Sequence, residues 1–150
     1  MRIVLQCVKR AAVFYDDAKY SEIGKGLTVV VGIVSGDGEE DMDSVVRTVT
    51  KARLFSDGEK RWRKSVVGIG GEVLCISNFT LAGGFNKKVV PSFASAMGPD
   101  EARKAFSRLV EKLREVLGDR VKTGVFGEYT EIEQLSQGVV NMVYDSKAVA

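Results

Sequence analysis

The sequence predicts one α+β domain over residues 1–150, in which mostly antiparallel strands are combined with two helices. Three observations carry this prediction. Short runs of β-branched and aromatic residues dominate the first third and the tail. Two other stretches place apolar residues at helical spacing. The chain is 45% hydrophobic and 28% charged, as in an ordinary globular protein, and 150 residues is a usual length for one domain.

The N-terminal third is predicted to be strand. Residues Ile3–Val8 and Ala12–Tyr15 are rich in β-branched and aromatic side chains, and Leu27–Val34 is a continuous apolar run. Such a run is typical of a strand that is covered on both faces. The cluster Ser35–Gly38 is a turn that ends it.

The first helix is predicted from an apolar stripe with spacings of three and four residues, formed by Met42, Val45, Val46, Val49 and Ala52. An acidic run precedes it, and basic residues lie near its end. This charge order complements the helix dipole. We therefore interpret the acidic run, residues 37–43, as a helix start in preference to a metal site.

The remaining elements follow in order. Gly68–Gly71 precedes a strand, Glu72–Phe79, so we interpret it as a tight turn in preference to a phosphate loop. A second helix begins at Pro99 after Gly98 and ends at Gly118. The tail is predicted to form three short strands, which are Val121–Phe126, Thr130–Leu135 and Val139–Tyr144.

The composition excludes several kinds of chemistry. The chain contains no histidine, which removes Ser-His-Asp triads, Cys-His pairs and HExxH zinc sites. The two cysteines, Cys7 and Cys75, lie in apolar runs and are expected to be buried, reduced thiols. We predict neither a metal site nor a cofactor. An enzyme built from this chain must use hydroxyls, amides, carboxylates, lysines, backbone dipoles or groups of its substrate.

No apolar run approaches the roughly 20 residues that span a bilayer. The first residues also lack the apolar core of a secretory signal. We expect a cytoplasmic protein without membrane association.

Positive charge is concentrated between residues 47 and 64, where seven basic residues accompany two acidic ones. An aromatic ring among basic residues can stack on an unpaired nucleobase while its neighbours hold phosphates. The alternative is a solvated turn whose tryptophan packs on the core. The candidate RNA-binding residues are Lys60, Arg61, Trp62, Arg63 and Lys64, with Lys87 and Lys88 as a second basic point.

Three polar side chains, Ser77, Asn78 and Thr80, close the strand that begins at Glu72, just before Gly83 and Gly84. Hydroxyls and an amide at a strand end beside a glycine loop are suited to hydrogen-bonding a ligand carbonyl. The same residues could equally satisfy the backbone of their own strand end.

This segment resembles the D-aminoacyl-tRNA deacylase family, in which Ser-Gln-Phe-Thr-Leu-Ala occupies the place of residues 77–82. The similar segments occur in family order along nearly the whole chain. The other segments are Glu22–Leu27, Leu54–Asp57, Pro91–Phe93, Gly98–Asp100 and Thr123–Phe126.

The resemblance implies a barrel-like β core, a homodimer and an aminoacyl-tRNA substrate. Members hydrolyse the ester that joins a D-amino acid or glycine to the terminal adenosine of tRNA. Ser77, Asn78 and Thr80 would lie near that ester as catalytic residues, with Phe79, Gly138 and Val139 binding the substrate. The family relies largely on the RNA's own 2′-hydroxyl and on backbone dipoles, which agrees with the lack of histidine. A covalent role for Thr80 is disfavoured because no general base is visible.

Three positions depart from the family. Asn78 replaces a glutamine, so the amide reaches one methylene less far. Cys7 replaces an arginine that braces a Gly-Pro loop. That loop carries a cis peptide bond and enters the partner's pocket as a chirality filter. Here Gly138-Val139 stands in its place. A cis bond before a residue other than proline costs about 2.5–4 kcal/mol, so we expect a trans bond.

The sequence therefore supports a dimeric aminoacyl-tRNA deacylase with relaxed chirality as the first hypothesis. The second is a catalytically inactive paralogue, which would bind nucleic acid through residues 60–64 or serve as a partner subunit.

Overall fold

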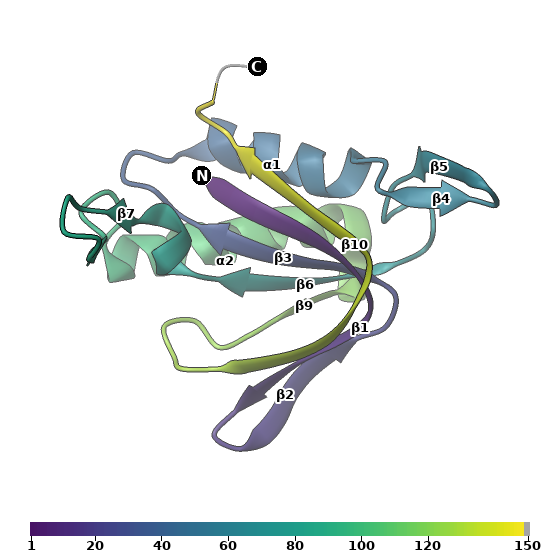
Figure 1. The fold of residues 1–150 in the computed structure, drawn as a ribbon, viewed down its shortest axis with the longest axis horizontal. Helices are drawn as coiled ribbons and strands as arrows, with labels where there is room; N and C mark the ends of the chain where they lie inside the picture. The colour runs from purple at the N-terminus through teal and green to yellow at the C-terminus, as the bar shows by residue number, and fades with distance from the viewer. Residues whose placement is uncertain (149–150) are drawn as a thin grey trace.

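A six-stranded, strongly curved sheet with two helices on one face forms the fold in the computed structural model, which describes residues 1–148 (Figure 1). The strand order is β10-β1-β3-β6-β9, and β2 pairs with β1. The α+β prediction is confirmed. The sheet consists of β1 (Arg2–Tyr15), β2 (Ala18–Ile23), β3 (Gly26–Gly32), β6 (Glu72–Ser77), β9 (Val121–Thr123) and β10 (Glu131–Asp145).

The helices and two small hairpins complete the molecule. The helices are α1 (Glu39–Lys51) and α2 (Pro99–Leu117), with short 3₁₀ turns at η1 (Phe79–Ala82) and η2 (Gly118–Arg120). The hairpins pair β4 (Phe55–Asp57) with β5 (Lys60–Lys64), and β7 (Gly84–Phe85) with β8 (Pro91–Ser92). They lie at opposite ends of the longest axis (Figure 1). None of the described helices is long and apolar enough to cross a membrane.

Both antiparallel and parallel pairing occur in the sheet. β1 is antiparallel to β2, β3 and β10, whereas β3–β6 and β6–β9 are parallel pairs. The first half of β1 pairs with β3 and its second half with β2, while β10 follows it along most of its length. This change of partner curls the sheet into a nearly closed, barrel-like shape.

The core consists of two apolar clusters, one on each face of the central strands. The larger lies between the sheet and the helices and includes Leu5, Val29 and Leu109. The smaller fills the inside of the curl and includes Val13, Leu74 and Ile76. Strand β6 places successive residues in both clusters, with Val73 and Cys75 in the larger one and Leu74 and Ile76 in the smaller. Strand β3 contributes only to the larger cluster, through Leu27, Val29 and Val31.

Both helices agree with the sequence prediction, as does the turn before Glu72, in which the Gly71 N–H donates to Val66 O over 2.9 Å. Several strand boundaries were wrong. β3 ends at Gly32 and not at Val34, and β9 ends at Thr123 and not at Phe126. The two predicted N-terminal strands are one strand, β1, because exposed residues around Lys9 lie at a register shift and not in a turn. Likewise, the last two tail strands form the single strand β10. Phe79 does not end a strand but begins η1.

A polar network ties the two ends of the described chain to α1. The Met1 amino group donates to Asp37 Oδ1 and contacts Ser146 Oγ, both over 2.7 Å. Asp41 Oδ1 accepts from Ser146 Oγ over 2.6 Å, and Asp41 Oδ2 accepts from Lys147 Nζ and Gly38 N–H over 2.9 Å each. The acidic run is therefore a helix start, as predicted.

Asp41 is expected to make the fold sensitive to acid. Burial raises the pKa of Asp41, but hydrogen bonds from Ser146, Gly38 and Lys147 outweigh it and hold that pKa well below its ordinary 3.8. A lowered folded-state pKa stabilises the fold above the unfolded value and is lost as pH falls further. We predict that Asp41→Asn lowers the free energy of unfolding at pH 7 by about 1–3 kcal/mol.

Urea unfolding of wild type and variant between pH 7 and pH 2 measures this effect. The difference between the two proteins should shrink as pH falls below about 4. Asp43→Asn is the matched control, because within residues 1–148 this exposed carboxylate forms only a surface ion pair, with Lys112 Nζ at 2.6 Å. A difference that is unchanged at pH 2 would contradict the assignment to Asp41.

Candidate active site

The polar end of β6 is held in place by the neighbouring strand. Ser77 pairs with Val31 in the parallel β3–β6 ladder, and the Asn78 N–H donates to Val31 O over 2.8 Å. Asn78 has extended backbone and caps η1, since its Oδ1 accepts from the Thr80 N–H over 2.9 Å. The Thr80 hydroxyl also donates to Asn78 Oδ1 in a short hydrogen bond. Asn78 and Thr80 thus form one rigid polar pair.

This pair leaves two groups for a ligand. The Thr80 hydroxyl donates its proton to Asn78 Oδ1, so the lone pairs of Thr80 Oγ1 remain able to accept a hydrogen bond from a ligand. The Asn78 Nδ2 group has no partner within residues 1–148 and can donate. Phe79 lies beside them with 62% of its surface exposed, in an edge-to-face contact with Phe93 at 4.9 Å between ring centroids. The arrangement is an apolar wall next to a donor and an acceptor.

Glycines allow η1 to lie directly on the sheet. A Cβ atom at Gly32 would come within 2.8 Å of Ala82 N, and one at Gly83 would come within 2.5 Å of the Phe93 ring. Ser95 also fixes the end of η1, because its hydroxyl donates to Ala82 O over 2.7 Å. These contacts define where the Asn78–Thr80 pair stands.

Gly138 and Val139 lie in an irregular part of β10. Gln6 pairs with Asn141 and Val8 with Ser136, so four residues of β10 face the single residue Cys7. The peptide bond between Gly138 and Val139 is cis, and the expectation of a trans bond was wrong. That expectation used the preference of an isolated bond, whereas here the ladder on both sides fixes where the loop begins and ends. Val139 projects from the loop with 71% of its surface exposed.

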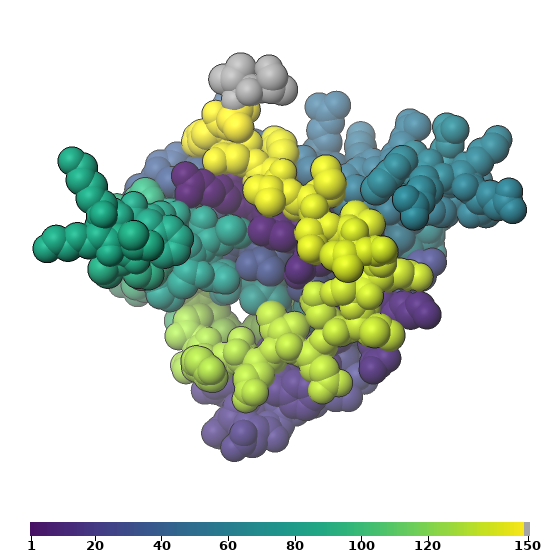
Figure 2. All heavy atoms as spheres, viewed as in Figure 1, coloured from purple at the N-terminus to yellow at the C-terminus, as the bar shows by residue number. Residues whose placement is uncertain are grey.

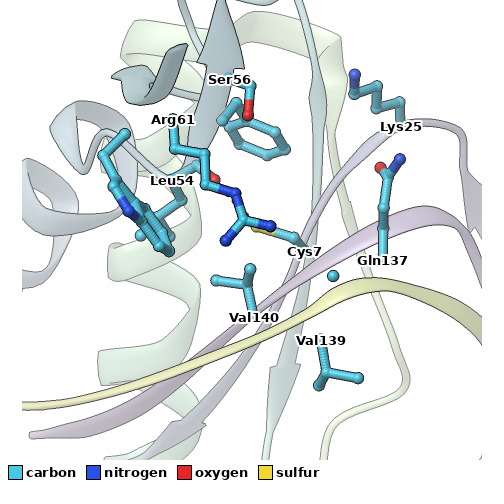
Figure 3. Close-up of a pocket in the computed structure, with 11 residues that line it drawn as sticks. Cys7, Lys25, Leu54, Ser56, Arg61, Gln137, Val139 and Val140 are labelled. Carbon is cyan, nitrogen blue, oxygen red and sulfur yellow. Dashed lines mark hydrogen bonds between the residues drawn. The ribbon is translucent and has the colours of Figure 1, made fainter. Parts of the chain in front are cut away.

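A cavity of about 270 Å³ separates this loop from the β4–β5 hairpin (Figure 3). The residues that line it are Cys7, Lys25, Leu54, Phe55, Ser56, Arg61, Trp62, Gln137, Gly138, Val139 and Val140. Ser77, Asn78, Phe79 and Thr80 are not among them. The structure therefore divides the predicted catalytic and substrate-binding residues of one chain into two groups, the polar end of β6 and the cavity beside Gly138.

The two cysteines are poor nucleophiles in this fold. Cys7 is 4% exposed at the cavity, where its thiol lies 3.8 Å from Leu54 O. Burial raises the pKa of Cys7, and the nearby positive charge of Lys25 opposes that rise only in part. Burial also raises the pKa of Cys75 to about 12. Both thiols are therefore protonated near neutral pH, as the expectation of buried, reduced thiols requires.

The basic segment forms strand β5, and its side chains are largely exposed. The alternative in which Trp62 packs on the core is wrong, because 52% of its surface is exposed. Lys64 Nζ lies 3.4 Å from Asp57 Oδ1. Lys87 and Lys88 are exposed in the loop between β7 and β8. The β7–β8 segment, green in Figure 2, lies at the opposite end of the molecule from the blue β4–β5 segment. The two basic points do not form one continuous patch on a single chain.

Comparisons with known proteins agree with this architecture. The family model for D-Tyr-tRNA(Tyr) deacylase matches residues 4–145. A D-aminoacyl-tRNA deacylase of Persephonella marina is 41% identical, covering 99% of this chain and 100% of the relative. One of Schizosaccharomyces pombe is 36% identical, covering 98% of this chain and 99% of the relative. The chain belongs to the D-Tyr-tRNA(Tyr) deacylase family.

Solved structures extend the likeness. The c-Myc DNA unwinding element binding protein superposes with a TM-score of 0.95 at 33% identity, covering 99% of this chain and 100% of its own. A probable eukaryotic D-amino acid tRNA deacylase superposes with a TM-score of 0.85 at 14% identity, which shows the shared fold alone. The barrel-like α+β architecture implied by the resemblance is confirmed.

Within this family fold, sequence reasoning missed part of the cavity wall. Lys25, Ser56 and Gln137 line it, and none was singled out as a site residue. The sequence did contain an indication that two of them matter, because Lys25 and Ser56 lie in two of the segments that resemble the family. Gln137 directly precedes Gly138. What the sequence could not show is that these segments meet in space.

Proposed function

We propose that this protein hydrolyses the ester bond of mischarged D-aminoacyl-tRNA. The observation that carries the proposal is the full-length likeness to D-aminoacyl-tRNA deacylases, joined to a polar strand end that offers one donor and one acceptor. Such a substrate belongs to translation, so we place the protein in the cytoplasm. The exposed basic residues of β5 are also suited to bind the phosphates of an aminoacyl-tRNA partner.

The chemistry follows from the free groups at the end of β6. The Asn78 Nδ2 group would donate to the ester carbonyl oxygen and stabilise the negative charge that develops on it. The Thr80 Oγ1 would accept from the substrate's ammonium group and fix its orientation. Water, activated by the 2′-hydroxyl of the substrate, attacks the carbonyl carbon. The acyl–oxygen bond then breaks, and the proton lost by the water passes to the leaving 3′-oxygen, giving a free amino acid and a 3′-hydroxyl on the RNA.

We further propose a homodimer in which each subunit completes the other's site. β10 is an edge strand of 15 residues, and edge strands with open backbone groups readily pair with another chain. Its exposed side chains include Val139 and Val143, at 71% and 73% exposure. Within one chain, no residue of η1 lines the cavity beside Gly138. A second copy could bring one subunit's Val139 to the other's Asn78.

The test is hydrolysis of D-Tyr-tRNA, Gly-tRNA and L-Ala-tRNA by the purified protein. We expect release of D-tyrosine at least about 10²-fold faster than in buffer, because preorganised donors contribute on that order. Comparable release from L-Ala-tRNA would show the relaxed chirality suggested by a residue other than proline at position 139. No release from any substrate, with tRNA affinity retained, would favour the inactive paralogue over the deacylase.

A further inference from the structure

The cavity between the β4–β5 hairpin and the Gln137–Val140 loop is lined by positively charged side chains and by no negatively charged one. Lys25 and Arg61 are among its lining residues, and no carboxylate is. Within residues 1–148 neither cation takes part in an ion pair. The Arg61 side chain extends into the cavity toward Cys7 and Val140, while Lys25 and Gln137 stand on its other side (Figure 3). An anion would find two cations there with no internal competitor.

The backbone of β5 is shaped to place two neighbouring side chains at this cavity. Successive residues of a regular strand point to opposite faces, yet Arg61 and Trp62 both line the cavity. A register shift between the Phe55–Lys64 and Asp57–Lys60 pairs makes this possible. Trp62 has φ of +60°, a left-handed conformation that is rare for a bulky residue. Backbone of this kind recurs where a protein clamps a ligand.

The resulting wall combines the two features that bind a nucleotide. A half-exposed indole offers a flat surface for a base, and the guanidinium beside it offers a planar donor for a phosphate. A simple inorganic anion would use the guanidinium but not the indole. The volume of about 270 Å³ is close to the lower end of ligand pockets, roughly 300–1,000 Å³, and suits one nucleotide but not a duplex.

We propose that this cavity binds one unpaired nucleotide of the RNA substrate, with its base on Trp62 and its phosphate held by Arg61 and Lys25. The assignment of the nucleotide to RNA rests on the proposed function. Gly138 and Val139 form part of the same wall, so the bound nucleotide touches both the hairpin and the loop of β10. The cavity is thus a positioning site that is separate, within one chain, from the Asn78–Thr80 pair.

Trp62 allows a direct test because it is the only tryptophan in the chain. Its fluorescence is followed while the trinucleotide CCA, AMP or inorganic phosphate is added to the purified protein. We expect saturable quenching by CCA, weaker binding of AMP and no quenching by phosphate alone. Arg61→Gln should weaken CCA binding by about tenfold or more, as loss of a charge-assisted phosphate contact does. Lys104→Gln, which removes an exposed charge on α2, should not.

A second variant covers the base contact. Trp62→Leu, followed by displacement of a labelled CCA, should weaken binding by about 5- to 100-fold if the base stacks on the indole. Equal binding of AMP and CCA would overturn the RNA assignment in favour of a free nucleotide. Absence of saturable quenching, or CCA binding unaffected by Arg61→Gln, would overturn the site itself. None of these measurements needs turnover, so deacylation without nucleotide binding would refute this inference alone, and nucleotide binding without deacylation would refute the proposed function.

Discussion

Asn78→Asp is expected to lower kcat for D-Tyr-tRNA hydrolysis by about 10²–10³-fold while leaving the fold intact, because one donor to a developing oxyanion is worth that much. Aspartate keeps the oxygen that accepts from the Thr80 N–H and hydroxyl, and it caps a helix as well as asparagine does. It replaces the Nδ2 donor by an acceptor. The measurement is single-turnover release of D-tyrosine, together with thermal unfolding of the same samples.

Two further variants separate catalysis from structure. Asn78→Gln, unlike Asn78→Asp, keeps the amide group on a side chain that is one methylene longer. It should retain activity within about tenfold of wild type. Asn86→Asp is the matched control, since Asn86 Oδ1 accepts from Lys88 N–H and Val90 N–H in an exposed loop in the same manner. If Asn78→Asp hydrolysed D-Tyr-tRNA at the wild-type rate, Asn78 could not be the oxyanion donor.

Gly26→Ala is expected to cost about 4 kcal/mol or more in the free energy of unfolding, a loss in the range of severe core substitutions. A Cβ atom at Gly26 would lie 1.8 Å from Glu72 O and 2.7 Å from Glu72 N. Gly26 and Glu72 are the first pair of the parallel β3–β6 ladder. Because the clash is with the Glu72 backbone, it can be relieved only by moving β3 and β6 apart at this pair.

Urea unfolding followed by far-UV circular dichroism measures this cost. Gly84→Ala serves as the control, because a Cβ atom there meets nothing within 4 Å. We expect it to change the free energy of unfolding by less than about 1 kcal/mol. A Gly26→Ala protein as stable as the Gly84→Ala protein would show that the β3–β6 contact is looser than the structure has it.

Local sequence patterns predicted the helices well, because their signals are contained within them. The stripe of α1 and the Gly-Pro start of α2 need no distant partner to be recognised. The break assumed after Val8 was wrong, because it rested on charged residues that are exposed at a register shift inside a continuing strand. Whether a polar interruption is a turn or a bulge depends on the partner strand, which the sequence of one segment does not contain.

The site was predictable in its parts but not in its assembly. Ser77, Asn78 and Thr80 were identified from their place after a buried strand and from the family resemblance, and their catalytic role stays a prediction. The cavity requires Lys25, Arg61 and Gln137 to meet from three separate segments. The left-handed backbone at Trp62 could not be predicted from the residue type, because tryptophan rarely adopts this conformation.

Strand β1 contributes to both apolar clusters, with Leu5 in one and Val13 in the other. Neither apolar cluster is therefore complete without β1. Loss of packing in one cluster also removes the strand that supports the other, so a partly unfolded state is not stable. The chain should accordingly lose its structure as a single cooperative unit, with amide protons along β1 exchanging only when the whole molecule opens.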